Sequence, residues 1–258
     1  MTNSVPEIEN ADCIMVMGSN TTGQHPMVAS KIMRAKARGA KLVVVDPRRI
    51  PLCEYADLFL QIKPGTNVAL ITAMIHVMEK KKLLADDFIK ERTEGIEALL
   101  EKVKEYPPEK AAEITGVEPG LIEKAAEAYA GAEKSMLLYA MGVTQHTSGT
   151  DQVKSVANLA MMTGNMGRKG TGVNPLRGQN NVQGACDMGA LYNVFPGYQK
   201  VADEAARAKF DEAWGVKCSD VTGLTVTEMM HAAHEGRMKG MVILGENPML
   251  SDPDINHV

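Results

Sequence analysis

The chain has 258 residues, of which 45% are hydrophobic and 23% are charged, and its formal net charge is −4. These values are typical of a globular protein with one large domain or two modest ones. The slight acidic excess argues against nucleic acid or a membrane surface as a partner. No apolar run reaches the roughly 18 residues of a membrane-spanning helix, and the polar N-terminus is not a secretory signal.

The cysteine pattern excludes several kinds of site. Cys13, Cys53, Cys186 and Cys218 are widely spaced and include no C-x-x-C pair. This spacing predicts neither a zinc site nor an iron–sulfur site, and no pair of histidines lies with carboxylates at metal-ligand spacing. So few cysteines do not suggest a disulfide framework either. We therefore expect no metal ligands in this chain and a reducing, cytoplasmic setting.

Strand and helix signals alternate in the first third of the chain. Short apolar runs predict buried strands over 13–17, 41–45 and 56–62. Helical patterns over 27–38 and 68–81 follow the first and third of them. Strand, helix and strand in this order form a βαβ unit, which predicts an α/β fold with a Rossmann-like parallel sheet and flanking helices. Ligands of such sheets bind at the carboxyl ends of the strands.

The rest of the chain contains further predicted helices and strands on both sides of a glycine-rich stretch. Further elements are predicted as helices over 94–104, 107–114 and 118–129, a strand over 135–141, a helix capped by Ser148 or Thr150 that runs to about Met162, helices over 202–214 and 226–234, and a strand over 241–244. Between them, residues 164–189 have no period and contain seven glycines but no charge run, which favours a ligand-cradling loop over a disordered one. We expect a Rossmann-like domain over 1–177 and a partial second α/β domain over 178–258.

The predicted strand ends share glycine together with asparagine, serine, threonine or glutamate. Glycine lets backbone amides approach an anion, and the polar side chains can bind phosphate, ribose or a base edge. Asp46 follows the second strand, where dinucleotide folds often place an acid for the ribose. The first loop is not G-x-G-x-x-G, however, and the span from Gly18 to Asp46 exceeds the usual length of about 20 residues. The pattern therefore favours a nucleotide other than a nicotinamide dinucleotide.

Arg177 is the strongest candidate for a substrate contact. It lies in a glycine-rich loop, and no acidic residue is nearer in the sequence than Asp187. A guanidinium without a local carboxylate can bind a substrate carboxylate through two parallel hydrogen bonds. A surface charge is the alternative reading of the same residue.

Several of these segments together resemble the molybdopterin formate dehydrogenases. The segment LRGQNNVQGACDMGALYNVFPGYQ is similar to their substrate-arginine loop, and GSNTTGQHP, VVVDPRR, QIKPGTN, MGVTQHTSGT and GENP are similar to cofactor-binding segments. The resemblance runs along the whole chain. It implies an internal fragment of the catalytic (alpha) subunit, with Arg177 as the residue that holds formate.

The resemblance also implies the cofactor-binding residues. Those for the guanosine end of one molybdopterin guanine dinucleotide are Gly18, Ser19, Asn20, His25, Asp46, Arg48, Lys63, Gly65 and Asn67. Asn67 stands where family members often have aspartate. Met141 and Gln145 would lie near the cofactor, Gln179 near the sulfur ligands of the metal, and Glu246 and Asn247 at the second dinucleotide.

The implied enzyme oxidises formate to carbon dioxide with a bis-(molybdopterin guanine dinucleotide) cofactor that holds molybdenum or tungsten. Electrons would pass to an iron–sulfur subunit or to a hydrogenase-linked or NAD-linked partner. Three parts of the family's enzymes have no counterpart in this sequence. They are the [4Fe–4S] cysteine cluster, which is expected before residue 1, the metal-ligating cysteine or selenocysteine, and the C-terminal barrel. The fragment alone is therefore expected to be inactive. The alternatives are a segment of a nitrate or other oxyanion reductase and a non-catalytic nucleotide-binding module.

Overall fold

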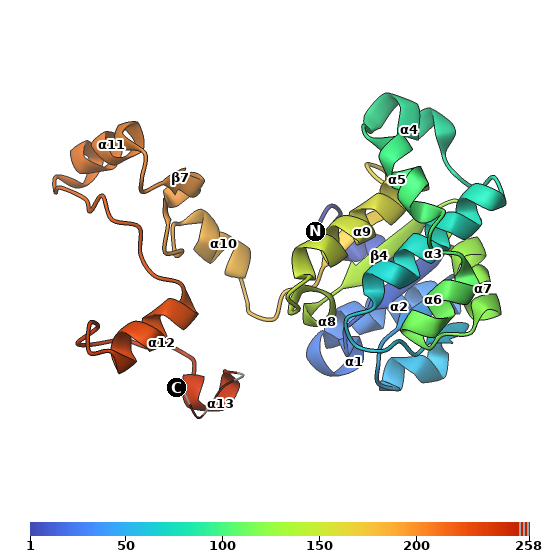
Figure 1. The fold of residues 1–258 in the computed structure, drawn as a ribbon, viewed down its shortest axis with the longest axis horizontal. Coiled ribbons are helices and arrows are strands. Elements are labelled where there is room, and N and C mark those ends of the chain that lie inside the picture. Colours follow the sequence, from blue (N-terminus) through green and yellow to red (C-terminus); the bar gives the residue numbers. More distant parts are fainter. Residues whose placement is uncertain (253, 255, 257) are drawn as a thin grey trace. The chain divides into compact units, whose positions relative to one another are not determined.

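The computed structural model describes residues 1–252, 254, 256 and 258, and the chain divides into two compact units, Met1–Gly178 and Gln179–Val258 (Figure 1). The first unit is built on a five-stranded sheet in the order β3-β2-β1-β4-β5, and every pair of neighbours is parallel. Its strands are β1 (Cys13–Met17), β2 (Lys41–Val45), β3 (Leu58–Leu60), β4 (Ser135–Tyr139) and β5 (Gly172–Pro175). This is the strand order of a Rossmann fold, so the predicted fold class is confirmed.

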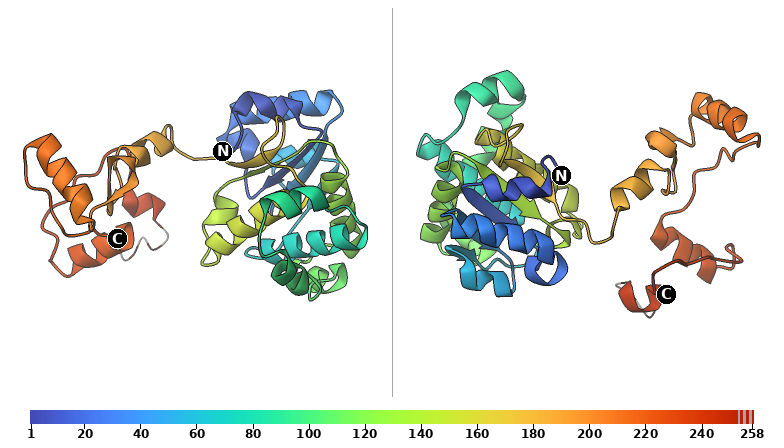
Figure 2. Two further views of the ribbon diagram at one scale, coloured as in Figure 1. Left: turned by 90° about the horizontal axis from the view of Figure 1, so that it is seen from above. Right: turned by 180° about the vertical axis from the view of Figure 1, so that it is seen from behind.

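Helices cover both faces of the sheet. Those of the first unit are η1 (Val5–Asn10), α1 (Thr21–Gln24), α2 (Pro26–Ala37), η2 (Pro51–Tyr55), α3 (Asn67–Lys80), α4 (Asp86–Arg92), α5 (Ile96–Val103), α6 (Pro108–Thr115), α7 (Pro119–Ala130), α8 (Met141–Thr144) and α9 (Gly149–Met162). Figure 2 shows the blue segment, which contains α2, on one side of the strands and the green helices on the other. No helix among the described residues is long and apolar enough to cross a bilayer.

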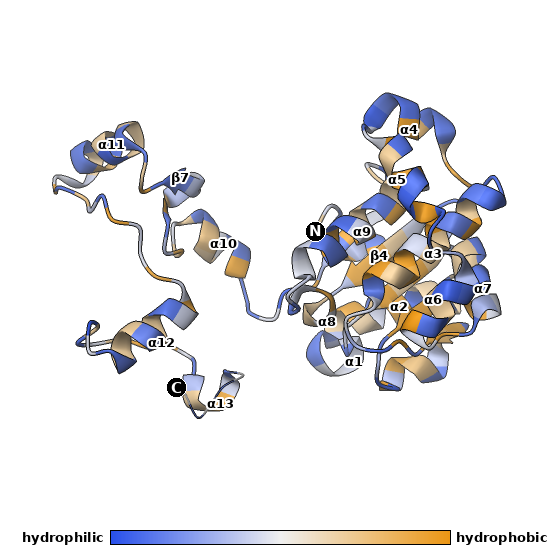
Figure 3. Cartoon of the chain, viewed as in Figure 1, coloured by the Kyte–Doolittle hydropathy of each residue, from blue (hydrophilic) through white to orange (hydrophobic). Residues whose placement is uncertain are grey.

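Alternation along the strands divides the interior into two cores. Met15 and Met17 of β1 face the core formed with α3, α7 and α9, whereas Ile14 and Val16 face the core formed with η1 and α2. A strand buried on both faces needs a continuous apolar sequence, which explains why CIMVM and KLVVV are apolar throughout. Along the helices, apolar and polar residues alternate as expected for helices with one buried face (Figure 3).

Most predicted elements of the first unit are present, with three differences. The third strand is only Leu58–Leu60, because residues 51–55 form a 3-10 helix before it. The fourth strand ends at Tyr139, and Met141 begins α8. The stretch 164–189 is not an irregular loop throughout, since it contains β5.

The N-terminal residues protect the exposed edge of β5. The backbone N–H of Thr2 donates to the carbonyl of Val173 at 3.2 Å, and the N–H of Val173 donates to the Thr2 hydroxyl at 3.0 Å. A sheet edge with unpaired backbone groups is open to aggregation, and this contact covers part of it.

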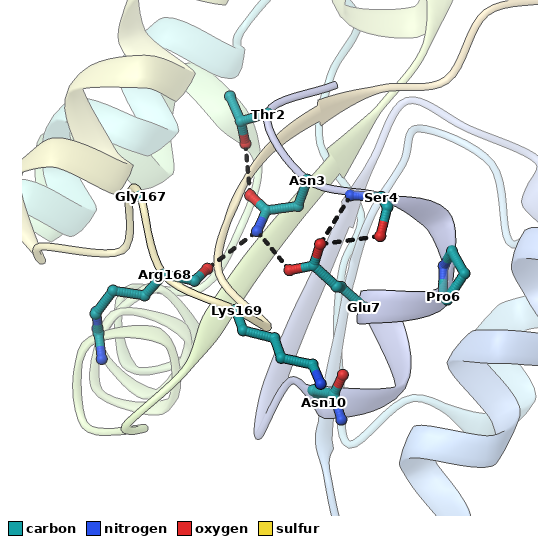
Figure 4. Close-up of a pocket in the computed structure, with 9 residues that line it drawn as sticks. All are labelled: Thr2, Asn3, Ser4, Pro6, Glu7, Asn10, Gly167, Arg168 and Lys169. Carbon is teal, nitrogen blue, oxygen red and sulfur yellow. Dashed lines mark hydrogen bonds between the residues drawn. The ribbon is translucent and has the colours of Figure 1, made fainter.

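A polar cluster fastens the same segment to the loop before β5 (Figure 4). The Asn3 amide donates to Glu7 Oε2 at 2.9 Å and to the Arg168 carbonyl at 3.0 Å, while the Ser4 hydroxyl donates to Glu7 Oε1 at 2.9 Å. The adjoining hollow, of about 610 Å³, is lined by these residues and by Lys169. The Glu7 carboxylate and the Asn3 amide at its centre bind one another. We therefore interpret these contacts as stabilising the N-terminal segment and not as forming a ligand site.

The second unit has a small aromatic core. Its elements are α10 (Val182–Asp187), β6 (Val194–Phe195), η3 (Pro196–Tyr198), β7 (Gln199–Lys200), α11 (Glu204–Trp214), α12 (Val226–His234) and α13 (Pro248–Ser251). The rings of Phe195 and Phe210 stack with centroids 4.6 Å apart, and Trp214 lies 4.9 Å from Phe210. Asp203 caps α11 by accepting hydrogen bonds from the N–H groups of Ala205 and Ala206.

The strand predicted over 241–244 is wrong. These residues form no regular element, and Val242 and Leu244 are 86% and 88% exposed. A strand is stabilised by hydrogen bonds to a neighbour, and no described segment pairs with this one. An apolar sequence alone does not make a strand.

The Glu7 cluster leads to a prediction about acid stability. Hydrogen bonds from Asn3 and then Ser4 lower the pKa of Glu7 from 4.5 to about 2. A lowered folded-state pKa stabilises the fold above the ordinary value, and that stabilisation disappears as pH falls through about 2. We expect Glu7→Gln to lower the urea midpoint, measured by circular dichroism, at pH 7, and the difference from the native chain to vanish toward pH 2. Glu54→Gln, an exposed carboxyl without a described hydrogen bond, is the control; an equal loss in both variants contradicts the assigned role.

Candidate functional site

The predicted site residues of the first unit lie at one edge of the sheet. Gly18 follows β1, Asp46 follows β2, Lys63 follows β3, Met141 follows β4 and Arg177 follows β5. Because all five strands are parallel, their carboxyl ends share this edge, which is where ligands of open α/β sheets bind. The strand ends therefore form a single candidate site.

A cleft of about 440 Å³ opens at the point where the strand order reverses, between β1 and β4. Its walls come from four strand ends. The lining residues are Gly18, Ser19, Asn20, Gln24, His25, Asp46, Pro47, Arg48, Ala140, Met141, Gly142, Leu176 and Gly178. Seven of the predicted residues line the cleft: Gly18, Ser19, Asn20, His25, Asp46, Arg48 and Met141.

Two glycines touch at the floor of this opening. Gly18 has φ +55°, and the N–H of Gly142 donates to its carbonyl at 3.1 Å. A Cβ added to Gly18 would lie 2.6 Å from the carbonyl carbon of Gly142, and one added to Gly142 would lie 2.6 Å from the Cα of Gly18. Only glycine at both positions lets the two loops pass at this distance.

Asp46 places a carboxylate in the cleft wall. The residue is 4% exposed, and its Oδ1 accepts a hydrogen bond from the N–H of Arg48 at 2.8 Å. Burial raises the pKa of Asp46, while the bond from the Arg48 backbone and the charge of the Arg48 side chain oppose the rise. A carboxylate with free oxygen lone pairs at the end of β2 can accept hydrogen bonds from ribose hydroxyls.

The loop after β1 is held by its own polar side chains. Ser19 is buried, and its hydroxyl lies 2.9 Å from that of Thr21. The Thr22 hydroxyl donates to Asn20 Oδ1 at 3.3 Å. These bonds fix the loop, and the half-buried Asn20 amide remains at the cleft as a possible donor.

The residues after β3 lie outside the lining of the cleft. The Lys63 ammonium donates to the carbonyl of Glu113 at 3.2 Å, and Gly65 has φ +82°. Asn67 is 2% exposed, and its amide nitrogen donates to the side-chain oxygen of Gln152 in α9. The Asn67 amide donor is thus used inside the protein, and the side chain is buried in this arrangement.

The segment after β4 presents exposed side chains. Met141 is 49% exposed, and Gln145 is exposed as well. Nε2 of His146 donates a 3.1 Å hydrogen bond to the carbonyl of Gly142, which stabilises the turn.

Arg177 follows β5 with an exposed side chain. Its guanidinium makes no hydrogen bond or ion pair with any residue that the structure describes. Its carbonyl, in contrast, lies 2.8 Å from Nε2 of His25. The backbone of this arginine is tied down, while its charged group stays available for an anion.

The other predicted residues belong to the second unit. Gln179, Glu246 and Asn247 are exposed there. Asn247 precedes α13, and Glu246 accepts a 3.4 Å hydrogen bond from the Ser251 hydroxyl. Within the described residues no group of three or more histidine, cysteine, aspartate or glutamate side chains is arranged to hold a metal ion.

Sequence reasoning missed several residues of the cleft wall. Gln24, Pro47, Ala140, Gly142, Leu176 and Gly178 line it but were not predicted as site residues. All of them lie within two residues of a predicted one or within the same strand-end segment. Treating each strand-end loop as a whole would have found them.

Comparison with known proteins gives a consistent picture. Residues 1–258 match the sequence profile of the molybdopterin oxidoreductase family. Over its full length the chain is 56% identical to the F420-dependent formate dehydrogenase subunit alpha of Methanocaldococcus jannaschii and 45% identical to formate dehydrogenase H of Escherichia coli. It spans 38% and 36% of those two relatives. Among solved structures, acetylene hydratase from Pelobacter acetylenicus is similar, with a TM-score of 0.58 and 28% identity, over 62% of this chain and 24% of that one.

The glycine contact generates a prediction about stability. We expect Gly18→Ala to cost about 2–5 kcal/mol of unfolding free energy, because it combines left-handed strain with overpacking. Gly142→Ala should cost about 1–3 kcal/mol from overpacking alone. The control is Gly95→Ala, which has φ +73° and open space around it, and which should cost only about 1–2 kcal/mol. Urea titration followed by circular dichroism measures all three, and equal effects at Gly18 and Gly95 would show that the close contact is not limiting.

Proposed function

The chain belongs to the molybdopterin oxidoreductase family, and on that premise we propose that it is the segment of a formate dehydrogenase catalytic subunit that binds molybdopterin guanine dinucleotide and positions formate. The names of its relatives support the substrate. One structural observation carries the proposal. The cleft at the strand-order reversal has glycines 18 and 142 at its floor and the Asp46 carboxylate in its wall, and Arg177 follows the neighbouring edge strand, β5.

The chemistry of the cleft fits a guanosine diphosphate moiety. Asp46 offers acceptors for ribose hydroxyls, and the Arg48 guanidinium offers donors and positive charge for a phosphate. Glycine at positions 18 and 142 keeps the floor free of side chains, so that a phosphate can approach the backbone. Outside the lining of the cleft, Asn67 is the proposed partner of the guanine base, and Lys63, Gly65, Met141 and Gln145 lie at the same edge of the sheet.

The second unit completes the proposed assignment. We assign residues 1–177 to a Rossmann-like domain and 178–258 to part of a second α/β domain, in which Gln179, Glu246 and Asn247 contact the second dinucleotide or the sulfur ligands of the metal. The same proposal includes molybdenum or tungsten as the metal and the cytoplasm as the location. It also includes an electron acceptor that is an iron–sulfur subunit or a hydrogenase-linked or NAD-linked partner.

Arg177 is the proposed formate-binding residue. Formate is a small planar carboxylate, and a guanidinium can hold it through two parallel hydrogen bonds. Holding the anion in a fixed orientation lowers the entropic cost of reaction, and the positive charge stabilises the negative charge that the substrate carries. The bound metal–pterin group supplies the two-electron oxidation chemistry, while this chain supplies binding and electrostatics.

Nucleotide selectivity is the first test. Calorimetric titration of the chain should show saturable binding of GDP and much weaker binding of ADP. Asp46→Asn should weaken GDP binding by roughly tenfold or more, since a hydrogen bond to a charged group contributes about 1.5–3 kcal/mol. Asp12→Asn, an exposed carboxyl before β1, is the matched control. A preference for ADP would point to an adenine nucleotide and remove the basis of the proposal.

The same Asp46→Asn variant separates binding from stability. Burial raises the pKa of Asp46 in the folded state above 3.8, so the native chain loses stability as pH rises through that raised value. The variant has no charge to bury. We expect it to be at least as stable as the native chain at pH 7 in thermal unfolding, with its advantage disappearing below about pH 3.8. Simultaneous loss of stability and GDP binding would mean that Asp46 acts through the fold.

The role of Arg177 is tested in the intact catalytic subunit. Arg177→Ala should lower kcat/KM for formate about 10²- to 10³-fold, the usual effect of removing one charge-stabilising group, while metal content stays unchanged. Arg92→Ala, an exposed arginine at the end of α4, should have no effect. Normal formate turnover in the Arg177 variant would exclude the proposed role, and a native enzyme that reduces nitrate but does not oxidise formate would identify an oxyanion reductase instead.

A further inference from the structure

His25 lies far from Arg177 in the sequence but contacts its backbone. The two positions are 152 residues apart, and Nε2 of His25 lies 2.8 Å from the carbonyl oxygen of Arg177. A carbonyl oxygen only accepts hydrogen bonds, so Nε2 must be the donor. We propose that His25 is a positioning residue that fixes the backbone of Arg177 and thereby the direction of its guanidinium.

The backbone of His25 is held by hydrogen bonds on both sides. Its N–H donates to the carbonyl of Thr21, and its carbonyl accepts from the N–H of Ala29 in the first turn of α2. Pro26 begins α2, and this helix packs on the sheet through buried Val28 and Ile32. The His25 ring can therefore hold another segment in place, because its own backbone is fixed on both sides.

The arginine segment, in contrast, has few ties. Leu176 is 5% exposed, and its N–H donates to the carbonyl of Tyr139 at 2.7 Å. Within the described structure, the bond from His25 is the only hydrogen bond made by residues 177 and 178. Without it, no described hydrogen bond would hold the backbone of residues 177 and 178.

His25 lines the cleft, where the resemblance implies a contact with the cofactor, and its hydrogen bond gives it a further role at Arg177. Its Nε2 is used by the Arg177 carbonyl, and its Nδ1 is buried without a hydrogen-bond partner. The Nε2–H of His25 is thus used by the Arg177 carbonyl, and the residue also lines the cleft. The ring links the loop after β1, which forms one wall of the proposed nucleotide cleft, to the residue that would hold formate.

The first test uses the chain without cofactor, and so does not depend on formate turnover. In His25→Gln the Nε2 amide can still reach the carbonyl, whereas the side chain of His25→Asn is one carbon shorter. We expect the ¹⁵N order parameters of the Arg177 and Gly178 amides to fall in His25→Asn from about 0.85 toward values below about 0.6, and to remain high in His25→Gln. Unchanged order in His25→Asn would overturn the proposal.

The second test uses the intact catalytic subunit and rests on the proposed function. His25→Asn should raise KM for formate by about three- to tenfold, the effect of one neutral hydrogen bond, with metal content unchanged. His25→Gln should restore the native KM to within about twofold. In the Arg177→Ala background, His25→Asn should have no further effect, because the two residues act as one unit.

The outcomes separate the two proposals. An equal effect of His25→Asn with and without Arg177, or a loss of metal content instead of a change in KM, would overturn the positioning role of His25. A native formate activity in Arg177→Ala alone would instead overturn the proposed function, while the backbone order measured in the free chain would still decide whether His25 holds Arg177.

Discussion

The contact between Gly18 and Gly142 is the constraint on which the site depends. Two adjacent parallel strands, β1 and β4, end side by side, and their loops must separate to make room for a ligand. Where the two loops begin, Gly18 and Gly142 lie so close together that neither position has room for a Cβ. The N–H of Gly142 donates a hydrogen bond to the Gly18 carbonyl at this point. Asp46 and Leu176, which follow β2 and β5, line the same cleft as these two glycines.

The sheet could be predicted where burial alone determines the sequence. β1 and β2 are covered on both faces, so their apolar runs are continuous and their bounds were predicted correctly. β5 escaped prediction because its sequence, GVNP, is stabilised by β4 on one side and by Thr2 on the other. Residues 241–244 show the opposite case, since their local pattern fits a strand but no described segment pairs with them.

The site could be predicted as a set of loops, but not as a set of contacts. Parallel topology guarantees that residues following different strands share an edge, and this rule placed Asp46 there from sequence alone. Arg177 was identified through its glycine-rich loop and the family resemblance, because β5 was not predicted. No local pattern indicates that the Asn67 amide binds Gln152, 85 residues later, or that His25 reaches Arg177. Such bonds depend on how helices pack after the sheet has formed, and a single sequence contains no direct signal of that packing.

An arginine that binds a small anion has to satisfy two opposing requirements. Its guanidinium must stay free of carboxylates, since a strong internal ion pair would compete with the substrate, and yet it must not swing freely, since orientation carries much of the benefit. In this chain the two requirements are met by different atoms. The side chain of Arg177 has no described partner, while its carbonyl is held by a histidine at the start of a packed helix. Fixing the backbone and leaving the charge free orients the guanidinium without neutralising it.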